Sequence, residues 1–372
     1  LTSFTVSFNA NNNPPYTSFY VELSTMDTFS PTTATWGWGL FVSTGADFTG
    51  LLSGTTYFAR AKARNQDLDQ TYFITLGSTR TGLTAPIAAS PAITSVGTIS
   101  ITGAWSDTVN PSGTTYESQI SSNSYTNYFT SSTALLSASF TNLLSTNTAY
   151  GLRVRAVNST NVSAWTTLTA STYTLSATPA TGNPTPVEIS SATALWGANT
   201  NPTGTFYQVQ ASTTNFAAIA EVIDSSITQL TSGLMINLST NTQHQMRVRS
   251  RNGNDLYGTW MVLPSTTTKA APPALAAQSF SNVYLTSFTV SFNANNNPTY
   301  TSFYVELSTM DTFSPTTATW GWGLFVSTGA DFTGLLSGTT YFARAKARNQ
   351  DLDQTYFITL GSTRTGLTAP IA

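Results

Sequence analysis

The sequence predicts an all-β chain of four tandem domains, and two observations support this prediction. One motif recurs four times, and its central residue is Tyr57, Tyr150, His244 or Tyr341, at spacings of 93, 94 and 97 residues. After each central residue, apolar and polar residues alternate, as in the run from Tyr57 to Arg64, in which alanines alternate with cationic residues. Alternation with a period of two marks a strand with one buried and one exposed face. At this spacing a chain of 372 residues holds about four domains.

The recurring motif has further fixed parts that point to a family. A leucine, a short polar turn, a threonine and a tyrosine precede an alternating Arg-Val-Arg run that ends in asparagine, as from Leu144 to Asn158. This motif resembles the E–F corner and F strand of a fibronectin type III domain, which is a tyrosine corner. The resemblance covers the whole chain and implies a two-sheet, seven-stranded sandwich without a disulfide in each domain. His244 departs from the pattern, so the corner hydrogen bond of the third domain is in doubt, although an imidazole can also donate one.

The motif spacing and the joints between repeats set the expected boundaries. We expect type III sandwiches at residues 1–84, 85–178, 179–270 and 271–372. In the fourth domain an alternating segment, Gln278-Ser-Phe-Ser-Asn-Val-Tyr284, precedes Leu285 and predicts strand A. The first domain begins at the equivalent Leu1 and lacks this strand. We interpret the sequence as a window cut from a longer polypeptide; the alternative is that a neighbouring chain donates the strand.

A longer repeat is superimposed on the domain repeat. Residues 1–88 and 285–372 agree at 87 of 88 positions, and the one difference is Pro15 against Thr299. The true period is therefore 284 residues, or three domains. A shared fold does not require such identity, which suggests recent duplication within a long array.

Within each domain the expected elements follow one order. Strand B carries an inward aromatic residue, a loop with Asn-Pro follows, and strand C comes next. In the first domain the inner face of strand C should hold Phe19, Val21 and Leu23, with Tyr20 and Glu22 outside. Short joints with proline close the domains and predict a semi-rigid array. The inward aromatics are Phe8, Trp105, Trp196 and Phe292, and the loops begin at Asn13, Asn110, Asn201 and Asn297.

Composition excludes several classes of protein. Only 8% of the residues are charged, the net charge is −2, and there is no cysteine. We therefore expect no nucleic-acid partner, no disulfide scaffold and no thiolate chemistry. No apolar run approaches the 18 residues of a membrane span. A surface filled by Ser, Thr, Asn and Gly is typical of secreted β-rich arrays, so we expect an extracellular or cell-surface location.

Catalysis and metal binding find little support. His244 is the only histidine, and its place in the tyrosine slot makes it a structural residue. Asp67 and Asp69, repeated as Asp351 and Asp353, could hold a cation only with a few oxygen ligands, whereas Ca²⁺ takes about six. We expect a solvated loop there, no enzyme, no catalytic residue, no metal and no cofactor.

Cations are concentrated on one face. Eleven of the 14 lie on the outer face of the expected F strands. Glu22, Glu117 and Glu306 should face them from strand C as cross-strand partners. The third domain has glutamines there, so Arg247, Arg249 and Arg251 are predicted to lack a partner and to be candidates for an intermolecular acidic or polar contact. The eleven are Arg60, Lys62, Arg64, Arg153, Arg155, Arg247, Arg249, Arg251, Arg344, Lys346 and Arg348.

Two tryptophan pairs are the other interaction candidates. Trp36 and Trp38, repeated as Trp320 and Trp322, are separated by one glycine, and this spacing predicts both indoles on one face of an edge strand. They could hold a sugar, bury against a neighbouring protein, or cover their own domain. The run from Trp36 to Val42 has no Lys, Arg or Pro, which are residues that block pairing between strand edges.

These observations favour a structural or interaction protein. We expect a segment of a long repetitive extracellular array that associates with itself into a surface fibre or sheath. Lateral contact at the Trp-Gly-Trp edge would recur with the 284-residue period. The alternatives are a carbohydrate-binding or adhesive array with a glycan partner, or accessory domains of a secreted depolymerase.

Overall fold

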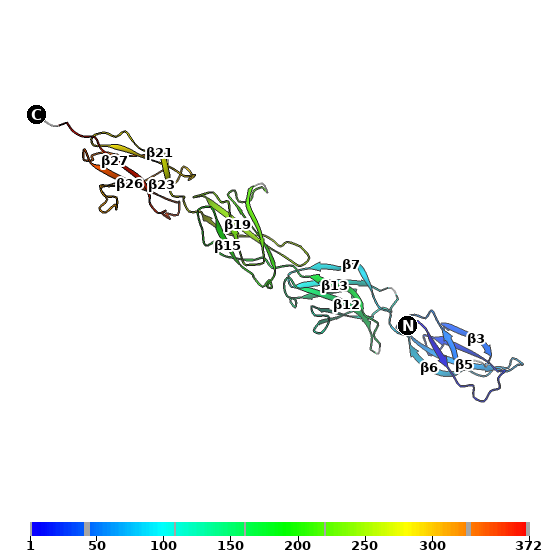
Figure 1. The fold of residues 1–372 in the computed structure, drawn as a ribbon. Coiled ribbons are helices and arrows are strands. Elements are labelled where there is room, and N and C mark those ends of the chain that lie inside the picture. The colour runs from blue at the N-terminus through cyan, green and yellow to red at the C-terminus, as the bar shows by residue number, and fades with distance from the viewer. Residues whose placement is uncertain are drawn as a thin grey trace. The chain divides into compact units, whose positions relative to one another are not determined.

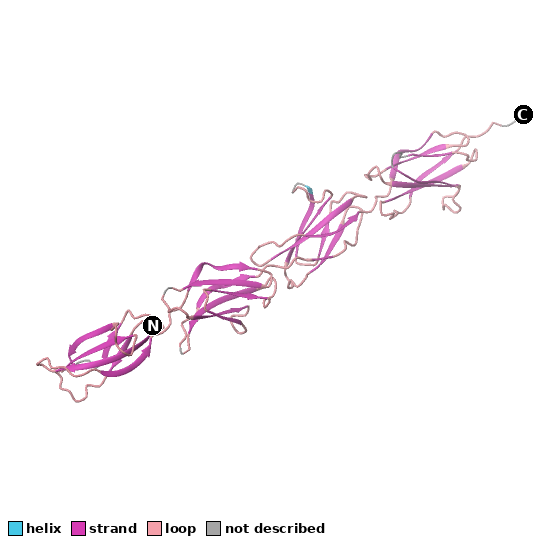
Figure 2. Cartoon of the chain, turned by 180° about the vertical axis from the view of Figure 1, so that it is seen from behind, coloured by secondary structure: helices cyan, strands magenta, loops and turns pink. Residues whose placement is uncertain are grey.

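The structure, a computed structural model, describes residues 2–40, 45–107, 109–159, 161–218, 221–324 and 329–369. Strands and loops make up nearly all of this part of the chain, and no α-helix occurs among the described residues (Figure 2). Two compact units divide the chain, Leu1–Leu175 and Ser176–Ala372, and each holds two β-sandwiches. The all-β prediction is confirmed, and Figure 1 shows the strands by label.

In the first unit, the first sandwich pairs a two-stranded sheet with a four-stranded one. The strands are β1 (Phe4–Ser7) and β4 (Gly45–Phe48) in one sheet, and β3 (Ala34–Leu40), β2 (Ser18–Ser24), β5 (Thr56–Arg64) and β6 (Ile74–Arg80), in that order, in the other. All described pairings are antiparallel. Six strands are therefore described in this sandwich, and none of them pairs with the second edge of β1.

The second sandwich of this unit has seven strands in the described residues. Its smaller sheet has the order β11 (Ser137–Thr141), β8 (Ser100–Ser106), β7 (Ile87–Val96), and its larger sheet has the order β10 (Phe129–Thr133), β9 (Thr115–Ser121), β12 (Ala149–Val157), β13 (Thr166–Tyr173). Here β7 occupies the place of strand A beside β8. Trp105 of β8 is buried in the core, as its apolar position in the strand predicts.

In the second unit, the third and fourth sandwiches repeat this arrangement. In the third, the smaller sheet has the order β14 (Ala180–Thr181), β15 (Ala192–Gly197), β18 (Ser232–Met235). Its larger sheet has the order β17 (Val222–Thr228), β16 (Phe206–Ser212), β19 (Gln243–Arg251), β20 (Met261–Thr267). In the fourth, the smaller sheet has the order β21 (Ala274–Ser281), β22 (Phe288–Asn293), β25 (Gly329–Phe332). Its larger sheet has the order β24 (Ala318–Leu324), β23 (Ser302–Ser308), β26 (Thr340–Arg348), β27 (Ile358–Arg364). The predicted domain boundaries stay predictions.

Side-chain alternation places the cores as the sequence predicts. In β2, Phe19, Val21 and Leu23 are buried, whereas Tyr20 and Glu22 are half-buried on the other face. In the long strands β5, β12, β19 and β26, every second side chain is buried. Because neighbouring side chains of a strand point to opposite faces, each cation between them is directed outward.

The tyrosine corner is present in three sandwiches and modified in one. The hydroxyl of Tyr57 accepts a hydrogen bond of 2.9 Å from the backbone N–H of Leu52, and Tyr150 and Tyr341 do the same at their own corners. In the third sandwich, Nε2 of His244 lies 3.2 Å from the carbonyl oxygen of Ser239. A ring N–H at Nε2 would donate this bond, so histidine reverses the direction of the corner hydrogen bond.

The first and fourth sandwiches, nearly identical in sequence, show the effect of strand A. In the fourth, β21 pairs with β22, and Leu275 lies opposite Phe292, which is 2% exposed. The equivalent Phe8 is only half-buried. Among the described residues, no strand covers β1 as β21 covers β22.

Asparagine side chains hold the backbone at the start of the second, third and fourth sandwiches. Oδ1 of Asn110 accepts a hydrogen bond from the backbone N–H of Thr84, and Nδ2 of Asn110 donates one to the carbonyl oxygen of Thr84. Asn201 clamps Ala177 in this way, and Asn297 clamps Ala271. Each clamp fixes the residue that leads into the next sandwich. The sequence indicated only a turn at these Asn-Pro loops. The recurrence of asparagine at the same place in each repeat was the signal that could have indicated the clamp.

Candidate interaction faces

The outer face of each four-stranded sheet carries cations interleaved with aromatic rings, which we call the cation–aromatic ladder. In the first sandwich, the guanidinium carbon of Arg60 lies 4.3 Å from the ring centre of Phe29 and 4.0 Å from that of Phe73. Arg64 lies 4.4 Å from the ring centre of Trp38. Contacts of this kind contribute about 0.5–1 kcal/mol each at exposed sites. The ladder therefore gives most of the predicted basic stripe a structural role.

The second and third sandwiches build the same ladder from different rings. Trp165 lies between Arg153 and Arg155, and Trp260 lies between Arg247 and Arg249. In the third sandwich all three cations of the ladder are arginines, whereas the first and fourth have two arginines and a lysine. From one end to the other it runs Phe216, Arg247, Trp260, Arg249, Tyr257, Arg251 and Phe206.

Carboxylates of strand C pair with the ladder where the sequence predicts them. Arg60 and Glu22 form an ion pair of 2.6 Å, and Arg344 and Glu306 form its copy in the fourth sandwich. Arg155 pairs with Glu117 at 2.7 Å in the second. These carboxylates are confirmed as cross-strand partners. Such partly exposed pairs contribute up to about 1 kcal/mol each.

The prediction that the third sandwich leaves its arginines without a partner is wrong. The side-chain oxygen of Gln210 accepts two hydrogen bonds from Arg247, and that of Gln208 accepts two from Arg249. Arg251 lies 3.4 Å from Asp255, which is largely exposed. A glutamine oxygen can accept from the guanidinium fork as a carboxylate does, but it carries no charge. The sequence analysis considered only acids as partners and so missed these bonds.

The positive charge on this face is nevertheless compensated less than elsewhere. Burial, and then the charge of Arg249, lower the pKa of Arg247. Nε of Arg251 is buried and has no hydrogen-bond partner among the described atoms. The two strand C positions opposite Arg247 and Arg249 hold glutamines. At the corresponding two positions, each of the other three sandwiches has one glutamate. The third face therefore combines three cations with two neutral acceptors and one exposed carboxylate.

The two tryptophans of each pair lie on opposite faces, which corrects the prediction that they share one. Val21 lies opposite Trp36 and Phe19 lies opposite Gly39, so both Gly37 and Trp38 oppose a single residue of β2. This β-bulge shifts the alternation by one residue. Trp36 packs against the core, whereas Trp38 stacks on Tyr20 of the outer face at 5.3 Å between ring centres.

The same arrangement recurs in the fourth sandwich. Trp320 packs against its core, and Trp322 stacks on Tyr304. A bulge is also one of the devices that hinder pairing between sheet edges, so β3 is better protected than its composition suggests. Phe41 and Val42, which belong to the predicted edge, lie outside the described residues.

His244 is fully buried at its corner. Burial lowers its pKa, and the hydrogen bond to Ser239 opposes this shift. Its Nδ1 has no hydrogen-bond partner among the described atoms. A neutral, buried imidazole with one structural bond has no described neighbour with which it could carry out acid–base chemistry.

The carboxylate loops form local turns. Oδ1 of Asn65 accepts from the N–H of Asp69, and Asp67 and Leu68 are exposed. The copy at Asp351 to Asp353 is also exposed. In the described part of the chain, no three His, Cys, Asp or Glu side chains gather as a metal site would require.

A carboxylate that the sequence analysis did not single out lies at the first joint. Asp107 accepts hydrogen bonds from the hydroxyl of Tyr116, from Nδ2 of Asn110 and from the backbone N–H of Val109. Burial alone would raise the pKa of Asp107, but these bonds together lower it. Oδ1 of Asn110 also accepts from Ser53 of the first sandwich. Asp107 therefore supports the residue that connects the two sandwiches of this unit.

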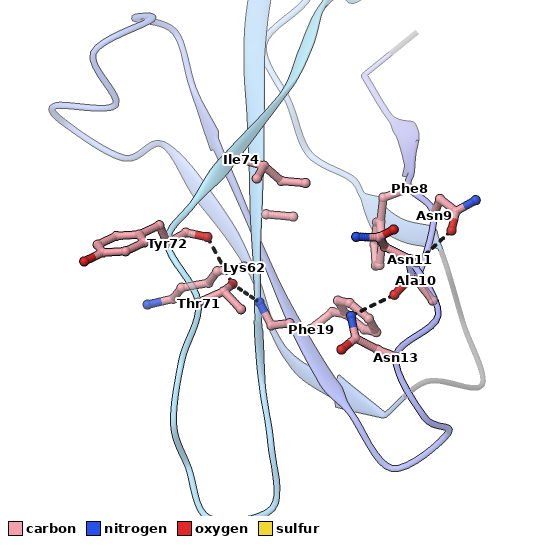
Figure 3. Close-up of a pocket in the computed structure, with 12 residues that line it drawn as sticks. Phe8, Asn9, Ala10, Asn11, Asn13, Phe19, Lys62, Thr71, Tyr72 and Ile74 are labelled. Atoms are coloured by element: carbon pink, nitrogen blue, oxygen red, sulfur yellow. Dashed lines mark hydrogen bonds between the residues drawn. The ribbon is translucent and has the colours of Figure 1, made fainter.

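A cavity of about 170 Å³ opens beside β1 in the first sandwich (Figure 3). Phe8 and Phe19 line it on one side, and Lys62, Tyr72 and Ile74 on the other. Its walls are apolar side chains, asparagine amides, the hydroxyl-bearing Thr71 and Tyr72, and a single lysine. The lining does not bring titratable groups together in the way catalysis needs.

Comparison with known proteins found similar solved structures but no similar sequence. No family model and no curated protein matches the sequence. Among solved structures, a two-domain fibronectin type III segment of chicken tenascin is similar with 13% identity and a TM-score of 0.35, over 51% of this chain and all of that one. The FN1-FN3 domains of chicken CNTN1 are similar with 14% identity and a TM-score of 0.23, over 73% of this chain and 97% of that one.

The resemblance stated from the motif agrees with the sheet topology. A three-stranded and a four-stranded sheet with a tyrosine corner at the start of strand F are the features of this sandwich. By its sheet orders and corner hydrogen bonds, the chain is a tandem array of fibronectin type III-like β-sandwiches. In the described residues no helix has the length and apolarity needed to cross a membrane.

Proposed function

We propose that this chain is a structural and interaction segment of a long repetitive extracellular protein, which associates with itself into a surface fibre or sheath. The observation that carries the proposal is the 284-residue repeat, in which 87 of 88 compared residues are identical. A sandwich core tolerates many apolar substitutions, so the fold alone does not require such identity. Identical surfaces at a fixed period supply many copies of one contact, and this raises the overall affinity of weak contacts.

The joints within each unit support a mechanical role. In the first unit, the hydroxyl of Ser53 donates to Asn110 of the following sandwich. In the second unit, Nδ2 of the buried Asn241 donates to Thr301, and its Oδ1 accepts from the N–H of Gln350. These side chains form bonds across the joint in addition to the asparagine clamps. A joint with several directional bonds resists bending more than a short linker alone.

The carbohydrate-binding alternative depended on two exposed indoles side by side. Trp36 packs against its own core, and the ring of Trp38 is stacked on Tyr20 and Arg64. A sugar ring binds well to an aromatic face that is free. The described pair does not offer two such faces, so the geometry favours protein–protein contact over glycan stacking.

The proposal is tested on the source cells and on the purified protein. Antibodies against residues 85–178 should label intact cells, and electron microscopy should show the label on a fibre or sheath. Labelling that requires permeabilised cells would contradict the extracellular location. Label that is diffuse, with no ordered assembly on the cell or in the purified protein, would contradict the structural role.

A further inference from the structure

The ladder face of the third sandwich differs from the other three in one chemical respect. In this sandwich Gln208 and Gln210 occupy the strand C positions where each of the others has one glutamate. Its third cation is Arg251, which lies at the end of the ladder beside Phe206. Asp255 and Glu221 lie at its rim, the first bonded to Arg251 and the second to Thr214. Arg247 and Arg249 are thus held in place by neutral amides rather than neutralised by strand C carboxylates, and Arg251 has only the exposed Asp255.

The geometry points to an acidic partner. Successive outward residues on a strand are about 6.6 Å apart, so the three arginines form a row of evenly spaced charges. Aromatic rings separate them, since Trp260 lies between the first pair and Tyr257 between the second. Guanidinium groups with free N–H donors bind carboxylates strongly. A segment with two carboxylates and an apolar side chain between them would complement this row.

The chain itself carries such a segment twice. Asp351 and Asp353 flank Leu352, which is 62% exposed, and the same residues recur as Asp67, Leu68 and Asp69. With a net charge of −2, the protein as a whole does not attract polyanions. These two facts favour a second copy of the chain over a free acidic polymer.

We propose that the face formed by Arg247, Arg249 and Arg251 binds the acidic loop 351–353, or its copy 67–69, of a second copy of this chain. The inference rests on the proposed self-association and names one contact within it. The chain has two such loops and one such face, so a pair of molecules can form two reciprocal contacts, each face with a loop of the other molecule. The contact should weaken with salt, since exposed charge pairs are screened.

The sharpest test adds the missing carboxylates without removing the ladder. Gln208→Glu with Gln210→Glu gives the two arginines the partners that Arg60 and Arg344 already have. Folding stability should be unchanged or higher, whereas the self-association constant, measured by sedimentation at low ionic strength, should fall by roughly tenfold or more. The matched control is Asn142→Asp with Gln278→Glu, which adds the same charge at two exposed positions in other sandwiches and should leave association unchanged.

A second variant tests the loop side. Asp67, Asp69, Asp351 and Asp353 are replaced by asparagine together, which leaves both turns their polar groups, and association should fall to a similar extent. If the wild-type chain associates but the glutamate variant associates equally well, the face is not the contact, although the proposed function stands. If the wild-type chain stays monomeric, self-association itself fails. A monomeric chain that binds polyglutamate through this face would overturn a second copy as the partner.

Discussion

The indole of Trp36 lies directly over Gly39 on the inner face of β3. A β-carbon at Gly39 would come within 2.2 Å of Cη2 of this indole, whereas a β-carbon at Gly37 would meet no atom within 4 Å. The same relationship holds between Trp320 and Gly323. The two glycines of the Trp-Gly-Trp-Gly run therefore have different roles, and one of them provides the space that the tryptophan fills.

Gly39→Ala should destabilise the first sandwich by about 1–3 kcal/mol, because overpacking forces the indole or the strand to move. Gly37→Ala is the matched control and should change the free energy of unfolding by less than about 0.5 kcal/mol. Urea unfolding followed by tryptophan fluorescence measures both. Equal effects of the two substitutions would contradict the packing of Trp36 over Gly39.

The two tryptophans should respond differently to replacement. Trp36→Ser removes a large side chain from the core and should cost about 3 kcal/mol. Trp38→Ser removes one aromatic stack and the contacts with Lys62 and Arg64, so its cost should be about 1 kcal/mol. Thermal unfolding of each single variant distinguishes them. A larger effect at Trp38 would mean that the faces are assigned the wrong way round.

The third sandwich should lose stability in mild acid. The pKa of His244 is lowered in the folded state, so the unfolded chain binds the proton more readily. Stability is therefore complete above the ordinary pKa of about 6.5 and falls as the pH decreases below it. His244→Tyr should remove this pH dependence and restore the corner hydrogen bond. Thermal melts between pH 5 and 8 test the difference.

A converse substitution serves as the control for this prediction. Tyr150→His places an imidazole in the buried corner of the second sandwich, where tyrosine normally accepts from Ser145. The second sandwich should then become acid-sensitive in the same range. If it does not, burial in the corner is not the cause of the effect at His244.

Asp107 should stabilise the second sandwich and its joint. Asp107→Ala leaves the hydroxyl of Tyr116 without its acceptor and frees Asn110 from one of its bonds, at a cost of about 1–3 kcal/mol. Since the pKa of Asp107 is lowered on folding, its contribution is present above its ordinary value near 4 and is lost as the pH falls through the folded pKa. Calorimetry at pH 7 measures the first effect. Asp67→Ala, in an exposed loop, should be neutral.

The asparagine clamp between the third and fourth sandwiches should be as important as a core residue. Asn297 is buried, and Asn297→Ala removes both bonds to Ala271 and the bond to the carbonyl oxygen of Ala294. Buried backbone groups left without partners cost about 1–3 kcal/mol. Amide hydrogen exchange at Ala271 should rise, whereas the core strand β23 should keep its protection. Unchanged exchange at Ala271 would contradict the clamp.

Local patterns in the sequence determined the strands and the cores. The alternation after Tyr57 and its three counterparts depends only on the two-residue period of a strand, and any half-buried strand must satisfy it. The same holds for the inner face of strand C at Phe19, Val21 and Leu23. The ion pair of Glu22 with Arg60 was also predictable, because the fold implied by the resemblance places strands C and F side by side.

Only the tertiary structure decided which groups meet across strands and joints. The bulge that separates Trp36 from Trp38 depends on how β3 pairs with β2, and the two-residue period cannot show an inserted residue. Gln208 and Gln210 are partners of arginines because a neutral amide oxygen can accept a hydrogen bond from a guanidinium group as a carboxylate can. A search of the sequence for residues of opposite charge does not find such partners. The clamp between Asn297 and Ala271 joins residues 26 positions apart, so the distance between them exists only in the folded chain.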